Sequence, residues 1–95
     1  MLRERATVRD YDGQGTYGPE YGPAYETRCR AEFMNKLVRN QNGDEVIATI
    51  RVFFLPEVKP PPGSLVTIRS EEFEVIETRV QFGLNAPSHT EVMAR

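Results

Sequence analysis

Apolar and polar residues alternate along several short stretches of the chain, which is the pattern of β-strands with one buried face. The clearest stretch covers residues 25–38. Its odd positions are largely apolar and its even positions largely charged: Tyr25, Thr27, Cys29, Ala31 and Phe33 against Glu26, Arg28, Arg30, Glu32 and Met34. A helix would scatter these apolar residues around its axis. We therefore expect a strand whose odd positions point inward, with Leu37 and Val38 joining it after a change of register.

Residues 46–55 form a second clear stretch, and here both faces are apolar. Val46, Ala48, Ile50, Val52 and Phe54 share one face, while the other face is Ile47, Thr49, Arg51, Phe53 and Leu55. Such a strand is either central in a sheet or covered on its outer face by a partner chain. The Asn42-Gly43 pair between the two stretches tolerates positive φ and predicts a tight hairpin turn.

Weaker stretches complete a succession of short strands separated by proline and glycine. Residues 2–11 alternate imperfectly, which suits an edge strand with a charged outer face. Residues 65–69 and 72–80 predict a hairpin that turns near Ser70-Glu71, and Ile76 breaks the alternation as a bulge or barrel corner would. Residues 88–94 read as a short last strand. The pattern predicts an all-β fold, a small single-domain barrel or sandwich of about six short strands.

Two segments between these strands read as connections rather than strands. Residues 12–24 are rich in glycine, proline and tyrosine and are expected to form a long loop or arm after the first strand. Residues 56–63 are a proline-rich connection. The barrel, with both connections, spans residues 1–95 as one domain.

Charge and composition narrow the function classes. The chain has 95 residues, 12 Lys and Arg, 14 Asp and Glu, and a net charge of -2, which disfavours a dedicated duplex-DNA binder. One cysteine excludes a disulfide framework and a multi-cysteine zinc site. The longest clean apolar run, residues 52–55, is far too short for a membrane span, and no apolar signal region follows Met1. We expect a reducing, aqueous compartment.

The residues that most often carry catalysis or bind metals are sparse. A nucleophile and base pair would need Cys29 and His89, which nothing local brings together. The Asp10-Tyr11-Asp12-Gly13 stretch begins like a calcium loop, but Tyr21 stands where the bidentate glutamate should be. Glu71, Glu72, Glu74 and Glu77 are typical of a solvated strand face. We expect no catalytic residues, no metal site and no cofactor.

The tyrosines of the 12–24 segment are a stronger signal. Tyr17-Gly18-Pro19-Glu20 and Tyr21-Gly22-Pro23-Ala24 form a tandem repeat that Tyr25 follows. Gly-Pro pairs prevent helix formation, and exposed tyrosines supply rigid contact area for a partner. Two interpretations stay open: the tyrosines contact a partner, or they lie on the domain's own core.

The strands and turns together resemble the small head-to-tail stopper (head-closure, neck) proteins of long-tailed bacteriophages. The resemblance spans about residues 25–80 and rests on residues 27–32, 36–39, 42–49, 51–56, 62–68 and 73–76. It is carried by the Gly43-Asp44-Glu45-Val46 turn, a strand that ends in Leu55-Pro56, and the Pro62-Gly63 hairpin. Ser64 stands where the family has an acidic residue, and Phe73 where it has tyrosine.

The resemblance implies a structural virion protein, made in the host bacterial cytoplasm, that forms a ring in the phage neck. Its expected partners are further copies in a hexameric or dodecameric ring, the portal or adaptor protein above, and the tail terminator or tail tube protein below. Packaged DNA would pass through without sequence-specific binding. Some stoppers close the channel with a long loop, whereas residues 40–44 here predict a tight turn, so either that turn or the 12–24 segment would constrict the channel.

The residues expected to contact partners or line the channel come from the 12–24 segment with Tyr25 after it, the 40–44 turn, and the outer faces of the two clear strands. They are Tyr17, Tyr21, Tyr25, Arg28, Arg30, Asn40, Gln41, Asn42, Asp44, Phe53 and Leu55. A small oligonucleotide-binding barrel acting alone is the alternative, which would need exposed aromatic residues on a basic strand face. A small enzyme that uses Cys29 and His89 is a third, weaker hypothesis.

Overall fold

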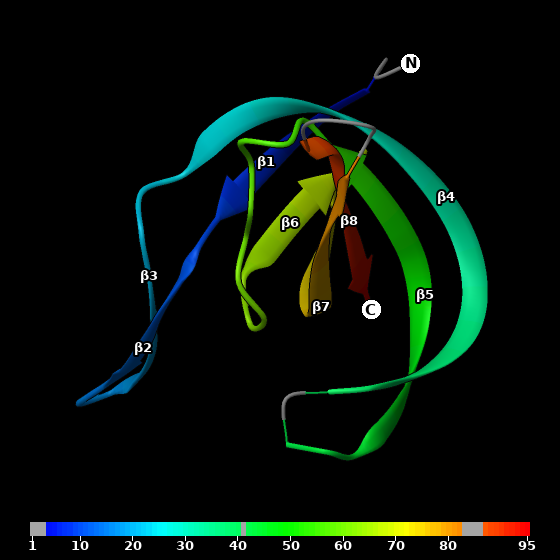
Figure 1. The fold of residues 1–95 in the computed structure, drawn as a ribbon. Helices are drawn as coiled ribbons and strands as arrows, with labels where there is room; N and C mark the ends of the chain where they lie inside the picture. Colours follow the sequence, from blue (N-terminus) through cyan, green and yellow to red (C-terminus); the bar gives the residue numbers. More distant parts are fainter. Residues whose placement is uncertain (1–3, 41, 83–86) are drawn as a thin grey trace.

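Six antiparallel strands close into a barrel in the computed structural model of the chain (Figure 1). The structure describes residues 4–40, 42–82 and 87–95. Around the barrel the strands follow the order β1-β4-β5-β8-β7-β6. Their bounds are β1 Glu4–Arg9, β4 Tyr25–Arg39, β5 Glu45–Phe54, β6 Leu65–Ile68, β7 Glu71–Phe82 and β8 Pro87–Ala94. The all-β barrel of six strands predicted from the sequence is confirmed, although β4 and β7 are longer than expected.

Barrel closure changes the position of β1. Thr7 faces both Glu26 of β4 and Thr67 of β6, so β1 is paired on both sides. The prediction of an edge strand for residues 2–11 is therefore wrong. The charged outer side chains of β1 therefore lie on a closed sheet, in which the first and last strands pair with each other. Closure removes the row of unpaired backbone groups that an open sheet presents at each edge.

The barrel interior is filled by the inward residues of alternating strand positions. Phe54 and Ile50 are the largest of the fully buried side chains. In β5 the even positions point inward, so its apolar odd face, with Ile47 and Phe53, points outward. The interior cluster consists of Ala6, Val8, Cys29, Ile50, Val52, Phe54, Val66, Ile68, Phe73, Val75, Val92 and Ala94.

Register shifts bend the long strands, and two of them lie where the sequence alternation breaks. The register of β4 on β5 shifts between Phe33 and Lys36, and the register of β7 on β8 shifts between Val75 and Glu77. Both changes were expected from the broken alternation. A second, smaller apolar cluster forms around the bulges, made of Ala48, Ile76 and Met93 with Met34, Val38 and Val46 packed against it.

Phe33 does not point into the closed core as the alternation predicted. Its side chain is 57% exposed, because β4 bends away from the barrel immediately after it. The ring packs against Phe73 with centroids 6.3 Å apart, and the Arg69 guanidinium lies 5.6 Å from its centre. Phe33 therefore borders the end of the barrel instead of filling it.

The β6–β7 turn lies one residue earlier than predicted. Arg69 and Ser70 both have positive φ, 53° and 68°, as the central residues of a two-residue hairpin turn require. The Arg69 guanidinium donates two hydrogen bonds to the Glu4 carboxylate, one of them 2.9 Å from Nε to Oε2. This ion pair ties the turn to the start of β1.

The 12–24 segment is a β-hairpin, not a loop. Strands β2 Tyr11–Gly15 and β3 Gly18–Tyr21 pair antiparallel and form a separate two-stranded sheet. Figure 1 shows this hairpin projecting from the barrel at the lower left. We call residues 11–21 the arm.

Candidate functional site

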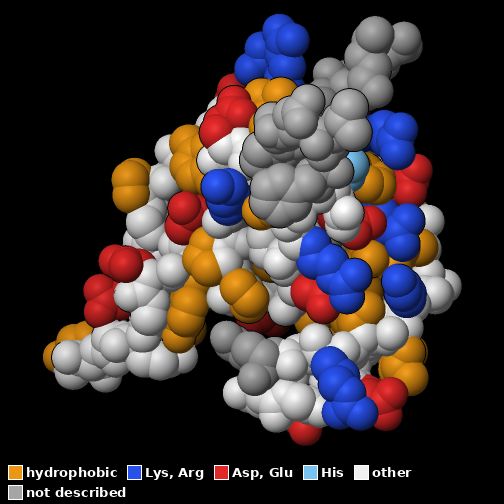
Figure 2. Space-filling view, in the orientation of Figure 1, with side chains coloured by type: hydrophobic (Ala, Val, Ile, Leu, Met, Phe, Trp, Pro, Cys, Tyr) orange, Lys and Arg blue, Asp and Glu red, His pale blue; other side chains and the backbone are white. Residues whose placement is uncertain are grey.

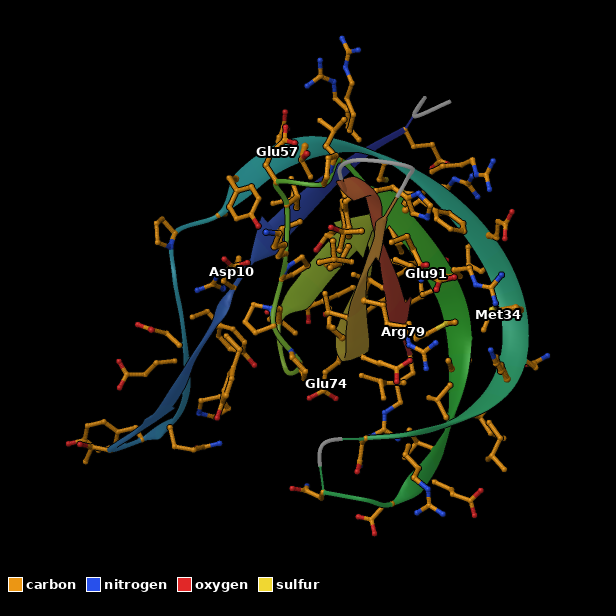
Figure 3. The ribbon with its side chains drawn as sticks, viewed as in Figure 1. Asp10, Met34, Glu57, Glu74, Arg79 and Glu91 are labelled. Atoms are coloured by element: carbon orange, nitrogen blue, oxygen red, sulfur yellow. The ribbon has the colours of Figure 1, made fainter. Side chains whose placement is uncertain are left out.

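The root of the arm is held to the barrel by backbone and side-chain hydrogen bonds. The Tyr11 amide donates to Ser64 Oγ at 2.9 Å, and the Gly22 amide donates to the Asp10 carbonyl at 2.9 Å. The Tyr25 hydroxyl donates to Asp10 Oδ1 at 3.0 Å. Figure 3 labels Asp10 at the point where the chain leaves β1 for the arm. The arm therefore leaves the barrel in a defined direction.

Aromatic contacts add to this root. The Tyr11 and Tyr21 rings meet edge to face with centroids 6.0 Å apart, and the Arg9 guanidinium lies 5.3 Å from the Tyr21 ring centre. Burial raises the pKa of the Tyr25 phenol to about 12, and the hydrogen bond to Asp10 and its charge act in the same direction. Tyr21 and Tyr25 therefore belong to the protein's own packing.

The arm tip presents Tyr17 to solvent. Its side chain is 102% exposed, the largest exposed fraction among the exposed apolar and aromatic residues that the structure describes. Gly18, with φ +124, completes the Thr16-Tyr17 turn. Of the three tyrosines expected to contact partners, only Tyr17 has a side chain that is fully exposed to solvent.

The outer face of β4, β5 and β8 carries a ladder of charged and aromatic side chains. Arg30 is opposite Phe53, and its guanidinium lies 4.7 Å from the ring centre. The Phe53 ring also meets the His89 ring edge to face at 5.4 Å. In the next row Arg51 Nε lies 3.0 Å from Glu91 Oε2, which joins β5 to β8. Arg30 and Phe53, both candidates from the sequence, are thus brought together.

Exposed apolar residues lie further along the β4–β5 hairpin. Leu37 of β4 is directly opposite Ile47 of β5, and both are more than half exposed, at 59% and 56%. Leu55, a sequence candidate, follows β5 and is 37% exposed. The Leu37–Ile47 pair was not among the candidates, although Ile47 shares the apolar outer face of β5 with Phe53 and precedes Leu55 on the same face.

The tip of the β4–β5 hairpin is polar and braced by its own side chains. Asn40 Oδ1 accepts hydrogen bonds from the amides of Asn42 and Asp44 at 2.9 and 3.0 Å. The Arg39 guanidinium donates to the Gly43 carbonyl at 2.8 Å. Gly43 has φ +85, as the Asn-Gly signal predicted. Gln41, another candidate, lies outside the described residues.

A cleft of about 130 Å³ separates this tip from the end of the barrel. Asn40 and Asn42 line one side, and Glu74, Ile76 and Arg95 are among the residues on the other. Figure 3 labels Glu74 on the part of the barrel above the hairpin tip. The tip is therefore a projecting element, not part of the barrel wall.

The structure separates the two residues of the suggested nucleophile and base pair. Cys29 is opposite Phe54 on the inner face and is fully buried, whereas His89 contacts Phe53 on the outer face. Burial, with a smaller contribution from Glu4, raises the pKa of the Cys29 thiol to about 11. Cys29 and His89 cannot act on a common substrate in this arrangement.

Within the ranges that the structure describes, no group of three or more His, Cys, Asp or Glu side chains is placed to hold a metal ion. The same ranges contain no helix long and apolar enough to cross a membrane.

Seven of the eleven sequence candidates fall into three places: the arm tip with Tyr17, the outer face with Arg28, Arg30 and Phe53, and the hairpin tip with Asn40, Asn42 and Asp44. Sequence reasoning missed Arg5, which pairing places directly opposite Arg28. Comparison with known proteins found no matching family model, no matching curated protein and no matching solved structure.

Proposed function

We propose that the protein is a structural subunit of a bacteriophage neck, where several copies form a ring between the portal or adaptor and the tail and help to close the DNA channel after packaging. The resemblance over residues 25–80 supports this proposal, and those residues build β4 to β7. Its turn signals lie at strand junctions: Gly43 is in the β4–β5 turn, and Gly63, with φ +95, lies before β6.

The observation that carries the proposal is a closed barrel with two projecting hairpins. Because β1 pairs with both β4 and β6, the closed part of the barrel offers no edge strand there for a partner to extend. Contacts with other chains must then come from the arm, the β4–β5 hairpin and the outer strand faces. These are the places where Tyr17, Leu37 and Ile47 are exposed. A ring subunit needs two different contact surfaces, and this distribution supplies them.

The proposed mechanism is mechanical. The outer faces and projections dock neighbouring copies and the proteins above and below, and one hairpin tip narrows the DNA path. The net charge of -2 suits a channel through which a polyanion slides, because 14 Asp and Glu offset the 12 Lys and Arg that could hold phosphates. Tyr17 at the arm tip and the braced Asn40-to-Asp44 turn are the two segments suited to that constriction.

Co-sedimentation with DNA-filled heads that lack tails tests the proposal. We expect the purified protein to sediment with tailless heads, and its binding to saturate at the number of copies in one ring per head. It should not sediment with tailed particles, because the tail already occupies the vertex. Failure to bind tailless heads, or equal binding to tailed particles, would contradict a role at the neck.

The oligonucleotide-binding alternative is supported by one observation, the placement of Arg28 and Arg30 beside the aromatic Phe53 on one outer face. A stacking platform needs a free ring face, whereas the Arg30 guanidinium already lies 4.7 Å from the Phe53 ring centre. Fluorescence anisotropy with a single-stranded oligonucleotide discriminates the two functions. Tight binding that weakens steeply between about 50 and about 200 mM salt would favour the alternative.

A further inference from the structure

All the charged residues of the arm are acidic. Residues 10–24 contain Asp10, Asp12 and Glu20 and no Lys or Arg. The Asp10 carboxylate accepts a hydrogen bond from Tyr25 at the root, whereas Asp12 and Glu20 on the two strands of the arm, and Tyr17 at its tip, are exposed. In Figure 2 the arm at the lower left shows red and orange side chains and no blue ones. The arm is therefore a projecting hairpin whose exposed side chains include acidic groups and a tyrosine ring.

The outer face of β1 and β4 carries the opposite feature. Arg5 of β1 is directly opposite Arg28 of β4, and both are exposed. Like charges directly opposite each other on neighbouring strands are destabilising, since their Cβ atoms are only about 4.5–5.5 Å apart. Glu26 approaches Arg5 at 3.8 Å, but no carboxylate of the described residues forms an ion pair with Arg28. Arg30 continues the same face.

The arm of one molecule cannot reach this face of the same molecule. Arg5 and Arg28 lie towards the Glu4 end of β1, and the arm leaves from the opposite end. At about 3.3 Å per residue, Arg5 is about 20 Å from the root at Tyr11, and the arm extends about 15 Å further away. Figure 1 shows the arm continuing the direction of β1, away from the N-terminus. Arm carboxylates that meet the Arg5–Arg28 pair must therefore come from another molecule.

We propose that the arm of one copy docks on the Arg5–Arg28 face of the next copy, so that copies join head to tail. This proposal rests on the proposed function, for which it names the contact between ring neighbours. Asp12 and Glu20 would relieve the Arg5–Arg28 repulsion, and the Tyr17 ring would stack on a guanidinium. Because the two surfaces differ, the contact is heterologous, and it generates a ring if the rotation between copies closes.

Charge reversal on each side tests the contact by sedimentation velocity of the purified protein. The arm variant is Asp12→Lys with Glu20→Lys, and the face variant is Arg5→Glu with Arg28→Glu. The matched control is Glu71→Lys with Glu72→Lys, which reverses two exposed acids of β7, two strands away from β1 around the barrel. Circular dichroism and thermal unfolding establish that each variant is folded. Runs cover about 10 µM to about 1 mM protein at about 20 mM and about 500 mM salt.

We expect the wild type and the control to associate with rising concentration, and high salt to weaken that association. Each double variant alone should lose self-association by about tenfold or more. An equal mixture of the arm and face variants should regain it, since the basic arm of one fits the acidic face of the other. A random surface effect of charge would not produce that recovery.

A wild type that stays monomeric throughout would overturn the docking proposal, as would variants that associate like the wild type. An oligonucleotide that binds the wild type but not the face variant, with self-association equal in both, would assign the arginine face to nucleic acid and also overturn it. The head-sedimentation test is separate. If the protein is a monomer in solution but binds heads, the neck function stands and the docking proposal fails. If it self-associates but does not bind heads, the docking proposal stands and the neck function fails.

Discussion

Single side chains at the arm root couple the arm to the barrel. Tyr25 and Ser64 each contribute one hydrogen bond, to Asp10 and from Tyr11 respectively, across sequence separations of 15 and 53 residues. Neither partner could be inferred from the sequence, because alternation shows which face a residue occupies and not which distant residue meets it. Tyr25 and Tyr21 were expected to contact partners, and in the structure both half-buried side chains make contacts within the protein.

The raised pKa values of Tyr25 and Cys29 predict loss of stability at high pH. Both groups keep their protons in the folded state to a higher pH than in the unfolded state, about 12 against 10.0 for Tyr25 and about 11 against 9.0 for Cys29. Unfolding therefore releases protons, and the free energy of unfolding should fall as pH rises from about 9 to about 12. Urea unfolding at several pH values measures it.

Tyr25→Phe isolates the tyrosine part of this dependence. Below pH 10.0 the variant should be less stable than the wild type by about 1 kcal/mol, because the hydrogen bond to Asp10 is lost. Between pH 10.0 and about 12 that difference should shrink, since only the wild type carries the perturbed phenol. A difference that grows with pH would contradict the assignment.

Gly63→Ala should destabilise the protein by about 1–2 kcal/mol. Gly63 has φ +95, and an added Cβ would lie 3.1 Å from the Tyr11 ring, which anchors the arm root. Gly22→Ala is the control, because its Cβ would meet only the Asp10 carbonyl oxygen at 3.9 Å. Thermal unfolding compares the two variants, and equal effects would argue against the close approach of Tyr11.

Among the elements, β4 and β5 were the most predictable and the arm the least. Apolar and polar positions alternate over a long span in residues 25–38, and apolar residues fill the inner face of residues 46–55. The sequence also indicates the bulge, by a break in the alternation, and the turn, by its Asn-Gly pair. The arm is rich in glycine and proline, which have low strand propensity. Its pairing depends on distant contacts at Gly63 and Ser64, so tertiary structure overrides the local preference.

The exposed Leu37–Ile47 pair predicts a contact made by the β4–β5 hairpin as an element. Replacing both residues by threonine, which retains high strand propensity, should leave the thermal unfolding temperature nearly unchanged and weaken binding to tailless heads. Glu72→Thr, an exposed position on β7, is the control. Head binding equal to the wild type would remove this face from the interface.

The whole molecule combines a closed barrel with two hairpins: the arm points away from the barrel, and the tip of the β4–β5 hairpin lies across a cleft from the end of the barrel. The all-β fold class follows from the number and spacing of the apolar stretches, whereas the pairing of β1 with both β4 and β6, which closes the barrel, does not. The position of Arg5 opposite Arg28 follows from strand register, which no local pattern specifies. The functional proposal thus joins a resemblance in residues 25–80 to surfaces that only the fold reveals.

The retention of packaged DNA by tailless heads tests the central claim most directly. DNA-filled heads without tails are incubated with increasing amounts of protein, and the DNA that becomes sensitive to nuclease is measured. A neck-closing ring predicts that nuclease-sensitive DNA falls in a saturable way, reaching its minimum at the ring stoichiometry found by co-sedimentation. Heads that release their DNA equally fast with and without bound protein would contradict the account.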